Sequence, residues 1–538
     1  MEDEFDAVVI GAGVSGLYAC HKLRERGLSV RVLEAGSGVG GTWYWNRYPG
    51  ARFDSESYTY QYSWSRDVID EWNWSEHFAG QPEIERYLNF VADKFDLKKD
   101  IQFDSRVKSV VFDEADKMWT LTTVDGRSVR AKYVLSATGF MSAYQMPDIE
   151  GIDTFEGISA HTARYPREGI DLRRKRVGVI GTGATAVQVI QSIASECGHL
   201  SLFQRSPNWC APLRNRPITP EERRDFNARA EEIFERCKST FAGFIHDANE
   251  KAGTEVSNEE RWKHYEAMYD RGGFALWLSN YSDFFTNREI AKDVSEFLAQ
   301  KIRERIRDPK TADKLIPKDH LYGTKRPPGE GGYYEVFNQE NVELVYLRET
   351  PIVRVTPKGI ETRDTSGNVR LHELDVIIYA TGFRAVTGEI MRMDIIGEHG
   401  QSLNDKWAEG PKTNLGVLSA GFPNFFCILG PHNPAAFCNV TRCAETNVEW
   451  IVDCIDHLRK TGRSTIQAKR EAEEIWTQRC YDSVKGLLIS EVRDSWFYGY
   501  RNPGGDRGRF LMFTEGVPAY RRIFKEIQAS GYEGFELR

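Results

Sequence analysis

The stretch Val8-Val9-Ile10-Gly11-Ala12-Gly13-Val14-Ser15-Gly16 decides the fold, because a short β-branched run leads directly into G-x-G-x-x-G and then into a helix-like segment. In such a unit the first glycine permits a tight turn, the second lets the backbone approach a pyrophosphate, and the third allows close packing of helix on strand. The N-terminus of the following helix attracts phosphate groups. The stretch therefore predicts a dinucleotide-binding unit in which Gly11, Gly13 and Gly16 lie at the ligand.

The same pattern returns at Val177-Gly178-Val179-Ile180-Gly181-Thr182-Gly183-Ala184-Thr185-Ala186. A second repeat, A-T-G-F, begins at Ala137 and again at Ala380, each time after an apolar run. We interpret each glycine motif and the A-T-G-F after it as the beginning and end of one unit. The sequence therefore predicts an α/β protein with two Rossmann-like units. The binding residues expected in the second unit are Gly181, Thr182, Gly183, Thr185 and Gln188.

The second unit spans a longer stretch of chain than the first, and residues 217–319 change to charged sequence with helical periodicity. Two capping boxes, Thr219-Pro220-Glu221-Glu222 and Ser257-Asn258-Glu259-Glu260, lie inside this stretch and are typical of helix starts. We therefore expect a mostly helical insertion in the second unit. No low-complexity linker is visible, which favours interleaved domains.

The two units differ at the position expected to contact the ribose, directly after the second strand of each unit. Glu34 follows the strand-like run Val30–Leu33 of the first unit, and its carboxylate would accept hydrogen bonds from ribose hydroxyls and repel a 2′-phosphate. Arg205 holds the corresponding place after residues 200–203 of the second unit, where a cation attracts a 2′-phosphate. The first unit is therefore predicted to bind FAD and the second to bind NADPH, a pair that defines a flavin oxidoreductase.

Composition excludes several other classes. The 538 residues are 41% hydrophobic and 28% charged, with a net charge of −8, so no basic excess indicates a nucleic-acid or anionic-membrane partner. Residues 1–6 are acidic and lead straight into a strand-like run, which predicts no signal or transit peptide. The longest apolar stretch, residues 7–20, is too short to span a bilayer. We expect a cytoplasmic protein, either a monomer or a homodimer.

Nine scattered cysteines favour a reducing compartment over a disulfide framework. Flavoproteins with two dinucleotide units include disulfide reductases, and Cys438 and Cys443 have a redox-like spacing. The pair nevertheless lies in the C-terminal quarter and lacks a glycine-rich helix start around it. We therefore interpret Cys438 and Cys443 as two small buried thiols.

Over nearly its whole length the chain resembles the Baeyer–Villiger monooxygenases, the class B flavin monooxygenases. One fingerprint of that family appears as Gly40-Gly41-Thr42-Trp43 followed by Tyr48-Pro49-Gly50 and Asp54. The family's linker fingerprint appears as Phe155, Gly157, His161, Tyr165 and Pro166. The combination of both fingerprints with the pair Lys325-Arg326 is specific, whereas either glycine motif alone is not.

Two positions depart from the family pattern. Tyr165 stands where the family usually has tryptophan, which keeps an aromatic plane and adds a hydroxyl. Arg384 follows the second A-T-G-F where the family usually has aspartate, so no role is carried over to it. His161 lies on the connection between the units, and we expect it to act structurally and not to transfer protons.

The resemblance implies an NADPH- and O2-dependent enzyme that converts a cyclic or terpenoid ketone to a lactone or ester through a C4a-peroxyflavin. That intermediate is an anion that must be kept from water, which requires a cation that cannot lose its proton. By resemblance Arg326 is this catalytic cation and Asp54 orients it. Lys325 and Ser206 are expected beside Arg205 at the 2′-phosphate. By resemblance Trp496 is expected on a mobile loop that closes over NADP and substrate, and the glycine-rich residues 499–509 that follow it fit such a loop.

The remaining cofactor-binding positions that we assign are Thr42, Trp43, Tyr60 and Val110. The expected division of the chain is residues 1–145 and 385–538 for the FAD domain, 146–216 and 331–384 for the linker and NADP domain, and 217–330 for the helical insertion. A heteroatom-oxidising or N-hydroxylating flavin monooxygenase stays open as the alternative, since it shares both glycine motifs. A non-catalytic flavin-binding redox sensor is a third interpretation, which the intact pair Lys325-Arg326 disfavours.

Overall fold

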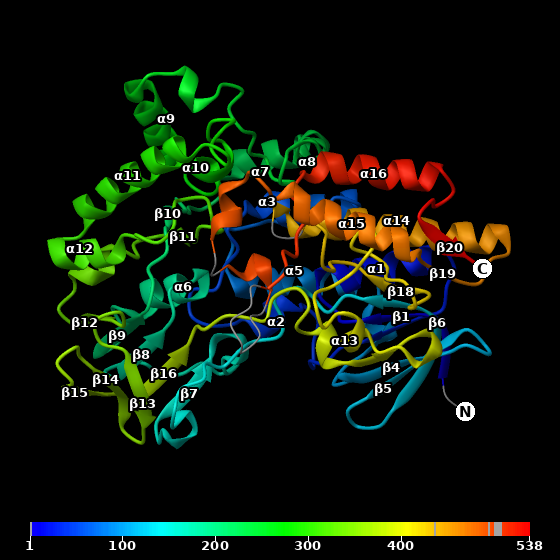
Figure 1. Ribbon diagram of the computed structural model, residues 1–538, viewed down its shortest axis with the longest axis horizontal. Coiled ribbons are helices and arrows are strands. Elements are labelled where there is room, and N and C mark those ends of the chain that lie inside the picture. Colours follow the sequence, from blue (N-terminus) through cyan, green and yellow to red (C-terminus); the bar gives the residue numbers. More distant parts are fainter. Residues whose placement is uncertain (1–2, 435–436, 493–494, 500–507) are drawn as a thin grey trace.

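The computed structural model describes residues 3–434, 437–492, 495–499 and 508–538. Its architecture is two sheets that lie side by side, one mixed and one parallel, with a helical region above them (Figure 1). The expected α/β fold with two Rossmann-like units is therefore confirmed. Within the described ranges no helix has both the length and the apolar character needed to cross a membrane.

The first sheet contains the first glycine motif and has the strand order β17-β4-β5-β6-β1-β2-β3, with β18 also paired to β6. β1, β2, β6 and β18 run parallel, so their carboxyl ends meet at one edge. Two of its strands come from the C-terminal third, which makes this unit discontinuous. The bounds are β1 (Asp3–Ile10), β2 (Val30–Leu33), β3 (Ile101–Gln102), β4 (Val107–Asp113), β5 (Met118–Thr123), β6 (Ser128–Ser136), β17 (Asp394–Ile396) and β18 (Phe425–Cys427).

Helices from both ends of the chain cover this sheet. The helix after the glycine motif, α1 (Val14–Glu25), packs against the long α14 (Val440–Thr461), and α14 packs against α16 (Val517–Ala529). Buried side chains of α1 and α14 share one apolar core with Tyr87 and Leu88 of α5 (Gln81–Lys94). The C-terminal helices thereby complete the first unit.

The second sheet contains the second glycine motif and has the order β12-β9-β8-β16-β7, in which every pair is parallel. The helix after the glycine motif is α6 (Ala184–Ile193). An antiparallel three-stranded sheet, β13-β14-β15, lies beside it in Figure 1. The bounds are β7 (Ile158–His161), β8 (Arg176–Ile180), β9 (His199–Gln204), β12 (Val342–Tyr346), β13 (Ile352–Thr356), β14 (Gly359–Arg363), β15 (Val369–Glu373) and β16 (Val376–Tyr379).

The stretch between β9 and β12 is mostly helical and also contains the short paired strands β10 (Ala211–Pro212) and β11 (Gly329–Glu330). In Figure 1 the helices α9 to α12 (green) stand above the second sheet, while α7 and α8 reach across to α16. Both sequence-predicted caps form: Thr219 and Glu222 make a reciprocal capping box, and the Ser257 side chain accepts the Glu260 amide N–H. The bounds are α7 (Pro220–Ala228), α8 (Ala230–Ser239), α9 (Asn258–Arg271), α10 (Ala275–Leu278), α11 (Arg288–Arg305) and α12 (Pro309–Leu315).

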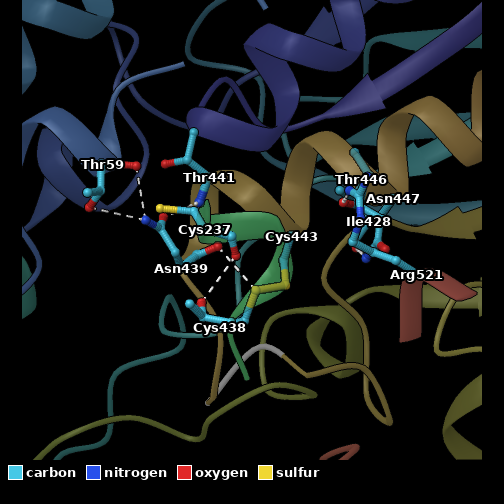
Figure 2. The surroundings of a disulfide bond; sticks show 11 residues. Thr59, Cys237, Ile428, Cys438, Asn439, Thr441, Cys443, Thr446, Asn447 and Arg521 are labelled. Atoms are coloured by element: carbon cyan, nitrogen blue, oxygen red, sulfur yellow. Dashed lines mark hydrogen bonds between the residues drawn. A yellow bond between two sulfur atoms is a disulfide. The ribbon is translucent and has the colours of Figure 1, made fainter. Parts of the chain in front are cut away.

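The interpretation of Cys438 and Cys443 as two free thiols is wrong, because the structure joins them in a disulfide (Figure 2). Both residues are buried, and their Cα atoms lie 6.4 Å apart at the start of α14. Cys438 directly precedes the N-cap Asn439 and Cys443 lies in the first turn of the helix, an arrangement that sequence spacing alone does not establish. The other seven cysteines are buried free thiols.

The disulfide predicts the number of reactive thiols. Protein unfolded without reductant should be alkylated at seven of its nine cysteines, and at all nine after reduction, because only the Cys438–Cys443 pair is oxidised. Peptide mass spectrometry would identify the protected pair. Alkylation of all nine cysteines without reductant would contradict the disulfide.

Candidate active site

The first glycine motif forms one wall of a cavity of about 530 Å³. Gly11 has a φ of +107°, and a Cβ there would lie 2.7 Å from the carbonyl oxygen of Ala137. At Gly16 a Cβ would collide with the carbonyl oxygen of Gly11, while at Gly13 it would approach Gly41 to 3.2 Å. The turn therefore needs glycine at Gly11 and Gly16 and leaves little room at Gly13, and Gly11 and Gly13 line the cavity with backbone.

Glu34 lies at the carboxyl end of β2, on the cavity wall. Its side chain is buried, and its two oxygens accept the amide N–H groups of Ala12 and Gly36, both at 2.7 Å. Burial raises the carboxyl pKa above its ordinary value, although these hydrogen bonds oppose the shift. The carboxylate is thus fixed beside the glycine turn, where a ribose would bind.

Aromatic side chains form another part of the wall. Thr42 and Trp43 begin α2 (Thr42–Trp45), and Tyr60 ends α3 (Ser57–Tyr60). The Trp43 indole N–H donates to the Tyr60 hydroxyl at 2.9 Å, so the two rings are held together. Val440, in the first turn of α14 and between the two disulfide cysteines, lines the same cavity.

The structure does not bring Val110 to the cavity. Val110 is fully buried in the middle of β4, paired with both β5 and β17, and it packs in the core of the first sheet. Val107 and Lys108, at the start of the same strand, line the cavity instead. The sequence prediction chose the right strand but a residue in its interior.

Arg326 and Asp54 form a two-pronged ion pair. The guanidinium donates from Nε and Nη2 to the two carboxylate oxygens, at 3.1 and 2.8 Å, and both side chains are about one-quarter exposed. Arg326 lies over the ring of Phe274 at 4.7 Å and near that of Phe244 at 5.9 Å. Asp54 is close enough to Tyr60 to add to the rise in the Tyr60 pKa that burial causes. The cation is therefore fixed in orientation next to the aromatic wall.

In the second unit, Gly181 has a φ of +127°, and a Cβ there would collide with the carbonyl oxygen of Ala380. A Cβ added at Gly183 would meet no heavy atom within 4 Å, so the turn is open at this place. The Thr182 hydroxyl donates to the Ser206 carbonyl at 2.6 Å, which ties the turn to the residues after β9. Gln188 is buried and bonds the first unit: its amide donates to the Arg52 carbonyl, and its oxygen accepts the Tyr48 hydroxyl.

Positive side chains gather at the carboxyl ends of β9 and β12. Arg205 is exposed and Ser206 half-buried directly after β9. Arg348 follows β12 and donates to the Ser206 hydroxyl at 3.0 Å and to Asp319 at 2.6 Å. Burial and then the nearby Lys325 lower the pKa of His320, which places Lys325 in the same group. Sequence reasoning identified Arg205, Ser206 and Lys325 but missed Arg348.

A signal for Arg348 existed in the sequence. It follows an apolar strand, as Arg205 does, and carboxyl ends of neighbouring parallel strands meet at one sheet edge. That β12 neighbours β9 was not visible, however, because residues 217–330 separate the two segments. The pairing of these strands is what brings the third cation to the edge.

The remaining predicted positions lie between the units. Trp496 stacks on Phe140 of the cavity wall with ring centroids 6.1 Å apart, while residues 500–507 of its expected loop lie outside the described residues. His161 ends β7, accepts the Ala163 amide N–H, and has its pKa lowered to about 4 by burial and then by Arg164. Tyr165 is buried, and the Arg384 guanidinium contacts the Met391 sulfur. Because its pKa is lowered to about 4, His161 is neutral near pH 7.

Comparison with known proteins identifies the class. The family model described as pyridine nucleotide-disulphide oxidoreductase matches residues 8–285. A 2-oxo-Δ3-4,5,5-trimethylcyclopentenylacetyl-CoA monooxygenase from Pseudomonas putida is 45% identical over 99% of this chain and 98% of its own. A phenazine N-monooxygenase from Lysobacter antibioticus is 40% identical over 99% and 97%. A crystal structure of OTEMO in complex with FAD and NADP matches with a TM-score of 0.95, 44% identity and full coverage of both chains.

The chain belongs to the Baeyer–Villiger monooxygenase family of FAD- and NADPH-dependent oxidoreductases. Its residues fit both cofactors. The first cavity offers a backbone turn for a pyrophosphate, a buried carboxylate for a ribose and aromatic walls. The second turn is open at Gly183 and adjoins the cationic edge that a 2′-phosphate requires.

The two glycines of the second turn should respond differently to one added methyl group. Gly181→Ala should destabilise the protein, because its φ is positive and the Cβ meets the Ala380 carbonyl. Gly183→Ala should keep the melting temperature but weaken NADP binding, because its Cβ enters the open side of the turn. Differential scanning fluorimetry would measure the melting temperatures of both variants, and titration with NADP would measure their affinity. A Gly181→Ala protein that folds and loses as much NADP affinity as Gly183→Ala would contradict this assignment.

Proposed function

We propose that the protein is a monooxygenase that uses NADPH and O2 to insert one oxygen atom beside the carbonyl of a cyclic or terpenoid ketone, giving a lactone or ester. The observation that carries the proposal is the two-pronged pair of Arg326 and Asp54, with Asp54 close to Tyr60 of the cavity wall. The relative from Pseudomonas putida, whose name specifies a cyclopentenyl substrate, supports the cyclic class.

Bound FAD would supply the two-electron chemistry that activates dioxygen. The task of the chain's own residues is then to hold a negatively charged oxygen group and to keep water from protonating it. Arg326 suits this task because a guanidinium stays protonated and presents several donors in a fixed fork. A preorganised charge of this kind can lower a barrier by roughly 3–4 kcal/mol. Asp54 fixes the plane of the fork, while Phe244 and Phe274 exclude water on its other side.

Oxidation of a ring nitrogen or another heteroatom is a second candidate function. It is supported by the similarity to the phenazine N-monooxygenase, which shares almost the full length of the chain. Incubation with NADPH, O2 and matched panels of ketones and N-heterocycles would distinguish the two functions. Turnover of heterocycles with no lactone or ester from any ketone would favour the second.

The role of Arg326 predicts uncoupling. Arg326→Ala should still oxidise NADPH, because the nucleotide turns stay intact, but it should release hydrogen peroxide and form no lactone. Gas chromatography of the product and a peroxide assay would measure both. The matched control is Arg354→Ala, which removes an arginine paired with Glu361 on the distant β13–β14 hairpin. Lactone formation that persists in Arg326→Ala would remove this residue from the mechanism.

The cationic edge predicts the choice of coenzyme. Replacing Arg205 and Lys325 together by glutamine should raise the KM for NADPH by at least about 100-fold, since each of the two lost hydrogen bonds to a charged group contributes ~1.5–3 kcal/mol and ~1.4 kcal/mol corresponds to a factor of ten. The KM for NADH should change little, because NADH has no 2′-phosphate. Arg348→Gln should have a smaller effect of the same kind, since Asp319 partly neutralises Arg348. Equal changes for both coenzymes would contradict the assignment.

A further inference from the structure

Two segments that are far apart in the sequence run side by side at Arg326. Asp54 of the first segment pairs with the guanidinium, and Phe244 of the second segment lies near its face. Two residues further along each segment, Glu56 and His246 meet directly, with His246 Nε2 2.8 Å from Glu56 Oε1. The two segments are therefore connected at two places, once through Arg326 and once through the Glu56–His246 pair.

The Glu56–His246 pair is buried. The side chains of Glu56 and His246 are 9% and 1% exposed, and they come from the first unit and the helical insertion, 190 residues apart. Among the described residues, neither the second oxygen of Glu56 nor Nδ1 of His246 has a hydrogen-bond partner. The pair is therefore the polar contact that joins the two segments at this point.

The electrostatics favour an ionised Glu56. Burial opposes ionisation, yet the positive charge and hydrogen bond of His246, with a contribution from Arg271, leave the carboxyl pKa below its ordinary value. A purely apolar contact could join the same two segments without the cost of burying a charge. A directional bond adds a defined register between the two segments, and the residues two positions away are those that hold Arg326.

Glu56 also connects to the cavity wall through its backbone. It precedes α3, and its carbonyl accepts the amide N–H groups of Thr59 and Tyr60. Tyr60 in turn accepts the Trp43 indole N–H on the wall. On the other side, the turn at Gly273 packs against Glu56 and leads directly into Phe274, which covers Arg326. A shift of the Glu56–His246 pair would therefore affect both the cavity wall near Asp54 and the ring that lies over the guanidinium.

We propose that Glu56 and His246 are positioning residues, whose buried bond locks the insertion onto the first unit in the register that keeps Arg326 between Asp54 and the rings of Phe244 and Phe274. The importance of this register for lactone formation rests on the proposed function. The positioning role of the Glu56–His246 bond concerns only the geometry of the chain and does not depend on the reaction.

The first test measures the geometry without cofactor or turnover. Phenylglyoxal modifies accessible guanidinium groups, and its rate at each arginine can be followed by peptide mass spectrometry. His246→Leu should raise the rate at Arg326 by about tenfold, because loss of a packed register exposes the face now covered by rings. Arg305 is the internal reference, since it has a similar exposure of 21% and is held by Glu330 and Glu335.

The matched control removes a different buried pair. Glu473 and Lys406, with side chains 3% and 9% exposed, form an ion pair that contacts neither Arg326 nor Asp54. Glu473→Leu should lower the melting temperature as His246→Leu does, yet leave the labelling of Arg326 unchanged. His246→Gln, which keeps a donor near the place of Nε2, should restore labelling toward that of the unmodified protein. Where His246→Leu does not fold, Glu56→Met, which keeps the length of the side chain but removes the acceptor, carries the test.

The second test measures coupling in the loaded enzyme. In His246→Leu and Glu56→Met, the fraction of NADPH that ends as hydrogen peroxide should rise by about tenfold while the KM for NADPH stays within about twofold, because a misplaced group costs rate more than binding. The proposal is overturned if these variants fold and match the unmodified protein in labelling and coupling, or if Glu473→Leu raises both equally. A protein that makes no lactone from any ketone refutes the proposed function, whereas the labelling result still decides the positioning role of the Glu56–His246 bond.

Discussion

The ion pair of Asp54 and Arg326 is the constraint that the rest of the site serves. It joins two parts of the chain that are 272 residues apart, one in the first unit and one at the end of the helical insertion. A guanidinium held from two sides by a carboxylate and by aromatic faces cannot rotate freely, so its donors keep one direction. The insertion must therefore stay packed on the first unit, and the extra helices of the second unit gain a function beyond covering a sheet.

A second constraint explains why A-T-G-F occurs twice. In both units the backbone of the first glycine faces the carbonyl of the alanine in A-T-G-F: Gly11 faces Ala137, and Gly181 faces Ala380. The alanine amide N–H bonds to the residue before the glycine in each case. The strand before each A-T-G-F, β6 or β16, thus closes against the first turn of its unit, and a side chain on either glycine would push the two apart. In each unit, the glycine motif and the A-T-G-F motif are therefore the two partners of one backbone contact.

The sequence predicted the features that local chemistry determines. Glycine turns, the acidic and basic residues after the second strands and the two helix caps depend on neighbours in the chain, and the structure contains these turns and caps. Val110, Arg348 and the cysteine pair depend on offsets that the sequence does not show. One residue's position along a strand separates a core side chain from a cavity wall, and the pairing of β12 with β9 brings Arg348 beside Ser206.

Gln188 illustrates the same limit and has a structural consequence. The sequence predicts it at the coenzyme, but both ends of its amide bond the first unit, at Tyr48 and at Arg52. Gly50 lies between these two residues, and a Cβ there would collide with Ser192 of α6, so the loop and the helix are in close contact. The same loop continues into Asp54. Because α6 starts at the second glycine turn, a coenzyme bound at that turn would lie at the start of a helix bonded directly to the segment that contains Asp54.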